Sequence, residues 1–219
     1  MKKVLYLLAC LFFLGGCSAK SVPDWTKASH HQLESYKNNY LQDKDRLAEI
    51  NFRKAAEEIK SSGSFNLLEK AYLTRYAVQV SVLEGFDDRD YRKLEAIEPH
   101  PENVHFYLFL KGAFDQVDET NLSQQYRPFL HACKKGKQAD VNLSIAAIED
   151  PLSRLIAVGL AVQKQLYDET SLTTAIQAAA EQGWKKAILV YLKKLRDYYE
   201  SINEQKKADV TRQRIDLIK

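Results

Sequence analysis

The chain has 219 residues, of which 45% are hydrophobic and 28% charged, and the 203 residues after the first 16 are enough for one large domain or a short repeat array. Its formal net charge is +3, but two of its 32 basic residues, Lys2 and Lys3, belong to the first 16 positions. The remainder carries 30 basic and 29 acidic residues, so its composition gives no argument for a nucleic-acid partner.

The first 16 residues have the pattern of a secretory signal peptide. Lys2 and Lys3 form a charged start, residues 4–14 are apolar, and Gly15 and Gly16 are the small residues expected at a cleavage site. The apolar run has about eleven residues, well short of the roughly 20 that a membrane-spanning helix needs. We therefore expect cleavage after Gly16 rather than a transmembrane anchor.

The string Leu14-Gly15-Gly16-Cys17 resembles the lipobox of bacterial lipoproteins, in which an aliphatic residue and two small residues precede a cysteine. The resemblance implies that Cys17 receives a diacylglyceryl group and becomes the acylated N-terminus, which holds the protein to a membrane. Ser18 follows it, and by the same resemblance a residue other than Asp here implies the periplasmic face of the outer membrane, with the inner membrane as the alternative. An ordinary cleaved signal with a chance cysteine is the other interpretation.

The cysteines leave no internal disulfide in a chain that has lost its signal. Cys10 belongs to the signal and Cys17 is the expected acylation site, so only Cys133 remains. It lies in the largely apolar stretch 129–133. We expect it to be a buried, unreactive thiol.

After the signal we expect two parts: a lipidated N-terminus and tether over 17–28, and one all-α domain over 29–219. Trp25 in the tether could lie at the membrane interface, since an indole ring has an apolar body and a polar N–H, or it could dock on the domain. The sequence leaves both open.

The first half of the domain predicts two long helical segments. Apolar residues recur at spacings of three, four and seven over 29–61, with Ser29 as N-cap, and the pattern lapses at 42–45, where a turn would split the segment. The next segment, 64–84, is apolar around much of its circumference and is expected to end at Gly85. A helix of that kind belongs in the centre of a bundle.

The middle of the chain predicts shorter helices over 87–97, 102–115, 121–134 and 139–148. The second of these is apolar enough to be a strand, but the chain offers it no partner strand. Pro128 is expected to kink or restart the third helix, because proline fits only the first turn of a helix.

From residue 139 on, the pattern is regular. Asp150 and Pro151 are expected as the N-cap and first residue of a helix. Gly159 lies inside that helix, where glycine costs ~1 kcal/mol relative to alanine, so we expect it to allow close approach of a neighbouring helix. The expected helices are 152–166, 170–182, 184–203 and 205–217. The predicted fold class is all-α, with stacked helical hairpins.

Leu195, Tyr199 and Ala208, together with the string Ala-Ala-Glu-Gln-Gly at 179–183, make residues 152–219 similar to tetratricopeptide and Sel1-like helical repeats. The departures are Val162 where the repeat usually has Tyr, Ser171 where it has Ala, and Arg212 where it has an aromatic residue. The resemblance implies a tetratricopeptide-like solenoid with a concave surface suited to peptides or partner proteins.

No motif for catalysis or cofactor binding is found. The sequence contains no zinc-protease, serine-hydrolase, phosphate-loop, dinucleotide or Cys-x-x-Cys motif. We therefore expect no catalytic residue, no cofactor, no metal site and no small-molecule substrate.

One candidate binding surface comes from charge. Residues 185–219 hold ten basic and five acidic side chains. Tyr191 and Tyr198 are seven apart on one helix face and Trp184 continues their line, with Lys194 nearby. This stripe is expected either to cap the core or, as the possible partner-binding site, to meet another protein. The adjacent stripe of Ile188, Leu192 and Leu195 is better suited to the core.

The function predicted from these features is a non-enzymatic adaptor or assembly factor, anchored as a lipoprotein in the bacterial cell envelope and bound to an envelope protein partner. The alternatives are a peptidoglycan-related or other envelope enzyme with an unrecognised site, and a purely structural lipoprotein.

Overall fold

A computed structural model describes residues 23–218. The expected signal peptide, the lipobox with Cys17, and Ser18 lie outside this range. The α-helices are α2 (Asp24–Leu41), α3 (Asp45–Ser61), α4 (Phe65–Ser81), α5 (Arg89–Glu95), α6 (Pro101–Leu110), α7 (Arg127–Lys135), α8 (Gln138–Ala146), α9 (Pro151–Gln163), α10 (Glu169–Glu181), α11 (Lys185–Ser201) and α12 (Gln205–Ile218). Three short 3₁₀ helices, η2 (Phe114–Gln116), η3 (Glu119–Asn121) and η4 (Gln124–Tyr126), join α6 to α7.

The all-α prediction is confirmed, because residues 23–218 contain helices and turns and no strand. The apolar run over 102–115 is helical in its first part, as α6, and not a strand. None of the helices in this described range is long and apolar enough to cross a membrane.

The helices end in a recurrent way. After eight of them the chain turns through one residue with left-handed backbone, which reverses its direction within a few residues. These residues are Asp43, Gly63, Leu83, Gly112, Gly136, Gln165, Gly183 and Asn203. Because the connections are short, consecutive helices such as α2 and α3, or α11 and α12, pack against each other as antiparallel neighbours.

Several helix starts follow the expected capping chemistry. Asp150 caps α9 by accepting a hydrogen bond from the Ser153 backbone N–H at 2.7 Å, and Pro151 opens the helix. Asp168 and Ser171 form a reciprocal capping box at the start of α10. The serine that departs from the repeat pattern therefore has a structural role at this helix start.

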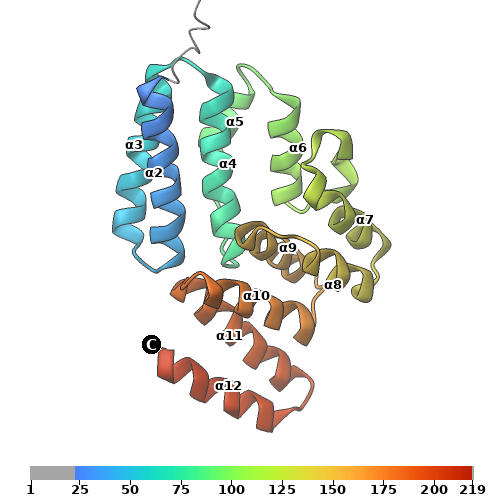
Figure 1. Ribbon diagram of the computed structural model, residues 1–219. Coiled ribbons are helices and arrows are strands. Elements are labelled where there is room, and N and C mark those ends of the chain that lie inside the picture. The colour runs from blue at the N-terminus through green and yellow to red at the C-terminus, as the bar shows by residue number, and fades with distance from the viewer. Residues whose placement is uncertain (1–22, 219) are drawn as a thin grey trace, which may run out of the picture.

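Helix α4 is the centre of the molecule. It contacts α2, α3, α5, α6 and α9, and residues on all of its sides are buried. Figure 1 shows α4 between the α2–α3 hairpin and α6, with α9 crossing near its C-terminal end. The prediction of a central helix over 64–84 is confirmed, although the helix ends at Ser81 and not at Gly85.

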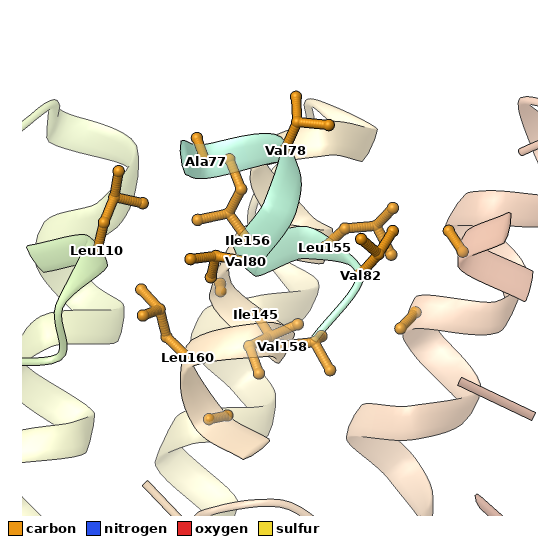
Figure 2. Packing of buried hydrophobic residues seen from close by; sticks show 14 of the residues in the cluster. Ala77, Val78, Val80, Val82, Leu110, Ile145, Leu155, Ile156, Val158 and Leu160 are labelled. Atoms are coloured by element: carbon orange, nitrogen blue, oxygen red, sulfur yellow. The ribbon is translucent and has the colours of Figure 1, made fainter. Parts of the chain in front are cut away.

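The contact between α4 and α9 depends on Gly159. A Cβ atom placed on this glycine would lie 2.2 Å from the carbonyl oxygen of Val80, so no larger residue fits without movement of one backbone. Around the contact, Ala77, Val78 and Val80 of α4 lie near the α9 side chains (Figure 2). The expectation that Gly159 allows close approach of a neighbouring helix is confirmed.

At the other end of the molecule, α10, α11 and α12 follow one another in space in the order of the sequence (Figure 1).

The start of the helical domain differs from the prediction. Helix α2 begins at Asp24, so Ser29 is not an N-cap but a buried residue inside the helix, with its hydroxyl donating to the Thr26 carbonyl. Trp25 belongs to α2 and is half-buried.

Candidate functional site

The structure separates the four residues that the sequence proposed for partner binding. Trp184 and Tyr191 have only 7% and 0% of their surface exposed. The Tyr191 hydroxyl donates to the backbone carbonyl of Leu155 at 3.0 Å, and burial raises its pKa. The Trp184 indole N–H donates to Asn38 Oδ1 of α2 at 3.3 Å. The expectation that Trp184 and Tyr191 form an exposed binding stripe is therefore wrong. Both are core residues, because their rings fill the space between α11 and its neighbours.

Tyr198 and Lys194 remain partly exposed. The ring of Tyr198 contacts that of Tyr167, with 6.1 Å between centroids, and the Lys194 ammonium lies 4.9 Å from the centre of the Tyr167 ring. These contacts tie both residues to the loop between α9 and α10. They leave a small surface cluster instead of a continuous aromatic stripe.

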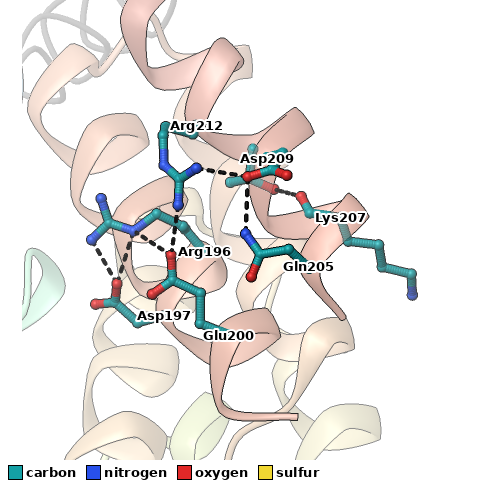
Figure 3. A network of polar contacts seen from close by, with 8 residues as sticks. Arg196, Asp197, Glu200, Gln205, Lys207, Asp209 and Arg212 are labelled. Atoms are coloured by element: carbon teal, nitrogen blue, oxygen red, sulfur yellow. Dashed lines mark hydrogen bonds and ion pairs between the residues drawn. The ribbon is translucent and has the colours of Figure 1, made fainter. Parts of the chain in front are cut away.

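The basic surplus of the C-terminal segment is also partly paired. On the outer faces of α11 and α12, Arg196 lies 2.6 Å from Asp197, and Arg212 lies 2.9 Å from Glu200 and 2.6 Å from Asp209 (Figure 3). The side chains are largely exposed, so the network adds little stability. It does lower the positive charge that this face presents to a partner.

Trp184 is part of a junction between the first hairpin and the last helices. Next to it, the Lys186 ammonium lies 3.1 Å from carboxylate oxygens of both Asp45 and Glu84 and 3.9 Å from the centre of the Tyr40 ring. Burial alone would lower the pKa of Lys186, but the hydrogen bonds to the two carboxylates outweigh it and raise the pKa. The N-terminal hairpin and α11 are thereby joined although they are far apart in sequence.

A groove of about 660 Å³ is lined by both polar and apolar side chains. It is formed where α4, α6 and α9 meet the irregular segment 120–127, with one residue from α2. The apolar lining comes from Leu73, Ala77, Phe106, Leu122, Tyr126, Leu152 and Ile156. The neutral polar lining comes from Thr74, Asn103, Thr120, Asn121, Ser123, Gln124, Gln125 and Ser153. The volume lies within the range typical of ligand-binding clefts.

The charged groups of the groove have partners in the protein. Lys70 lies 3.9 Å from Glu102, and Lys37 lies 2.6 Å from Glu34. The Arg127 guanidinium donates to the backbone carbonyls of residues 120 and 122, and Asp150 caps α9. What the groove offers a ligand is therefore an apolar floor with neutral hydrogen-bonding groups.

Behind one wall of the groove lies a buried polar cluster. Glu69 of α4 is completely buried, and its Oε2 accepts a hydrogen bond from Asn103 Nδ2 at 2.7 Å and lies 3.2 Å from His100 Nδ1. Asn103 Nδ2 also lies 3.0 Å from Asn66 Oδ1 and 3.3 Å from the Asn66 carbonyl oxygen. These contacts fix one polar side chain of the groove wall in a single orientation.

Cys133 and the potential metal ligands are further candidates for a reactive site. Burial raises the pKa of the Cys133 thiol to about 12, which agrees with the expectation of a buried, unreactive cysteine. Within residues 23–218 no group of three His, Cys, Asp or Glu side chains is placed to hold a metal ion.

No protein family, no curated protein and no solved structure matches the chain with significant similarity. Its function must therefore be argued from its own residues.

Sequence reasoning missed the groove. Its lining runs from Lys37 to Ile156, and its polar edge is the segment 120–125, which the sequence placed near the start of a helix. The available signal was compositional: Thr120, Asn121, Ser123, Gln124 and Gln125 gather five uncharged polar side chains within six residues, between two apolar segments.

Proposed function

We propose that this protein is a lipid-anchored adaptor or assembly factor of the bacterial cell envelope, whose helical domain binds a partner protein. Acylation at Cys17 would hold it to the membrane, and Ser18 favours the outer membrane, facing the periplasm. The lipobox supports the anchor, and the groove between α4, α6 and α9 is the observation that carries the binding function.

The packing of the C-terminal helices supports a repeat-like architecture. Helices α9, α10, α11 and α12 contact one another in chain order, as stacked hairpins of a tetratricopeptide-like array would. The contacts of α4 with α9 and of α2 with α11 depart from an array in which each unit touches only its neighbours. We infer a divergent array that folds back on itself and leaves the groove on its inner side.

The anchor is tested by replacing Cys17 with serine. Two or more acyl chains hold a protein stably to a membrane, because each buried CH₂ contributes ~0.8 kcal/mol. The variant is expected to lose the lipid and to leave the membrane fraction or keep its signal uncleaved. A Cys17→Ser protein that is correctly processed and still membrane-bound would refute the lipoprotein assignment.

The partner is tested by photocrosslinking in intact cells. A benzoylphenylalanine placed at Gln124, on the exposed edge of the groove, is compared with one at Gln213, on the exposed face of α12. We expect a discrete crosslinked envelope protein from position 124 and none from position 213. Equal crosslinking from both positions, or none from either, would count against the adaptor function.

A further inference from the structure

Asn103 is a lining residue of the groove, and its side chain has an acceptor that no described residue uses. Its side chain is only 3% exposed, and its Nδ2 is held by the Glu69 carboxylate and by the carbonyl oxygen of Asn66. A backbone carbonyl can only accept, so the nitrogen end of the amide must face that side. This arrangement fixes the orientation of the Asn103 carboxamide.

The other end of that amide, Oδ1, accepts no hydrogen bond from any group within residues 23–218. Asn103 is a lining residue of the groove, and Oδ1 is the atom of its planar amide that the contacts with Glu69 and Asn66 leave unused. A largely buried amide oxygen is stabilised when it gains a donor, so the fixed Oδ1 is suited to accept an N–H from a ligand.

The rest of the groove indicates what kind of donor would come. The apolar floor near Asn103 includes Leu73, Ala77 and Phe106, which would take an apolar side chain. Ser123 and Gln124 of the polar edge are exposed and can both donate and accept. Gln125 is exposed too, and its Nε2 already donates to Ser153 Oγ. An extended peptide suits an apolar floor beside a polar edge. Its successive side chains point to opposite sides, so one can enter the floor, while its backbone N–H and C=O groups stay free for hydrogen bonds.

Charge and ring geometry narrow the ligand further. Lys37 lies beside Glu34 and Lys70 beside Glu102, so the lining has little net charge with which to favour a charged ligand. A glycan usually stacks on an open aromatic face. Here Tyr126 is buried and the Phe106 ring is stacked on it, with centroids 6.2 Å apart. A neutral peptide therefore fits better than a sugar.

We propose that the groove binds an uncharged, extended peptide segment of the partner protein, one of whose backbone N–H groups donates to Asn103 Oδ1. This inference rests on the proposed adaptor function and names the chemistry of its partner.

The test uses the full-length protein in detergent and a display library of linear ten-residue peptides. The selected peptides are expected to be uncharged over their central residues. Methylating the backbone nitrogens of a selected peptide one at a time removes one donor each time. At one position this should weaken binding about three- to tenfold, as the loss of one neutral hydrogen bond does.

The Asn103→Ala variant, combined with peptide methylation, makes a double-mutant cycle that tests for the contact. The methylation penalty at that position should vanish in Asn103→Ala and persist in Gln213→Ala, the matched control on α12. Circular dichroism and thermal unfolding establish whether Asn103→Ala is folded. If it is not, the test uses Gln124→Ala on the exposed edge, which should weaken the unmethylated peptide.

Three results would overturn the inference: no peptide is selected, the selected peptides carry net charge in the segment that binds, or triacetylchitotriose binds the groove while the peptides do not. Crosslinking of a partner from position 124 combined with any of these would leave the adaptor function standing and remove only the peptide assignment. If no partner is crosslinked from position 124 but the selected peptides bind, the peptide-binding groove stands and the adaptor function is removed.

Discussion

Two regions of this protein use their polar and aromatic residues in opposite ways. In helices α9–α12 large side chains are buried in the packing between helices. The Tyr191 hydroxyl donates to the Leu155 carbonyl, and the Trp184 indole donates to Asn38 of α2. Between α6 and α7 the chain forms three short 3₁₀ helices, which bury Leu122 and Tyr126 and leave the side chains between them exposed. The regular region supplies stability, and the irregular region supplies free hydrogen-bonding groups.

The largest effect should come from Tyr191→Ala. Removing a fully buried aromatic ring leaves a cavity, and we expect a loss of about 3–5 kcal/mol in the free energy of unfolding, measured with urea. Tyr191→Phe keeps the ring and removes the hydrogen bond from its hydroxyl to the Leu155 carbonyl, which keeps its backbone partner inside α9, so it should cost about 0.5–1.5 kcal/mol. A Tyr191→Ala protein as stable as the wild type would show that this stripe is a surface after all.

Gly159→Ala should cause the second-largest loss in the free energy of unfolding. The added methyl group meets the Val80 carbonyl oxygen, and forcing α9 away from α4 should cost about 1–3 kcal/mol, despite alanine's better helix propensity. Gly85→Ala is the matched control, because a Cβ there meets nothing within 4 Å. Thermal unfolding should separate the two variants clearly. Similar midpoints for both would mean that the helices are not held as closely as described.

A smaller effect is expected at the junction. Lys186→Met keeps the apolar stem and removes the charge shared by Asp45 and Glu84, whose carboxylates are largely in water. The expected loss is about 1 kcal/mol or less, and it should shrink in high salt. Lys193→Met on the exposed side of α11 serves as the control. A salt-independent loss would assign the role of Lys186 to packing instead of charge.

The smallest effect on stability belongs to the groove. Gln124→Ala removes an exposed side chain with no hydrogen bond in the described part of the chain, so the free energy of unfolding should change by less than about 0.5 kcal/mol. The same substitution should weaken binding of the selected peptides. If it alters stability and leaves binding unchanged, the contrast between the two regions is lost.

The sequence predicted the helices well because burial imposes a period that can be counted. It also located Gly159, because glycine inside a strong helix pattern has few uses other than close packing. It did not separate Tyr191 from Tyr198: both lie on one helix face, and only the position of α9 decides which of them is covered. Leu83 could not be expected to have left-handed backbone, since bulky residues rarely adopt it.

The groove could not be predicted for a related reason. Asn103 is useful only because Glu69 and Asn66, more than thirty residues earlier, hold its nitrogen end. Such an arrangement has no period and no spacing rule. A run of uncharged polar residues between apolar segments, such as 120–125, indicates only weakly that these residues lie outside the core.

The contact between Trp184 and Asn38 spans 146 residues. In an array that grows from one end, the first hairpin could complete its structure as soon as it left a ribosome or a secretion channel. Here α2 obtains its last contacts only when α11 has arrived, and closing so long a loop costs conformational entropy before the contact compensates for it. The order of folding is therefore constrained: α2 can pack on α3 and α4 early, but the part of α2 around Asn38 is covered only when α11 is in place.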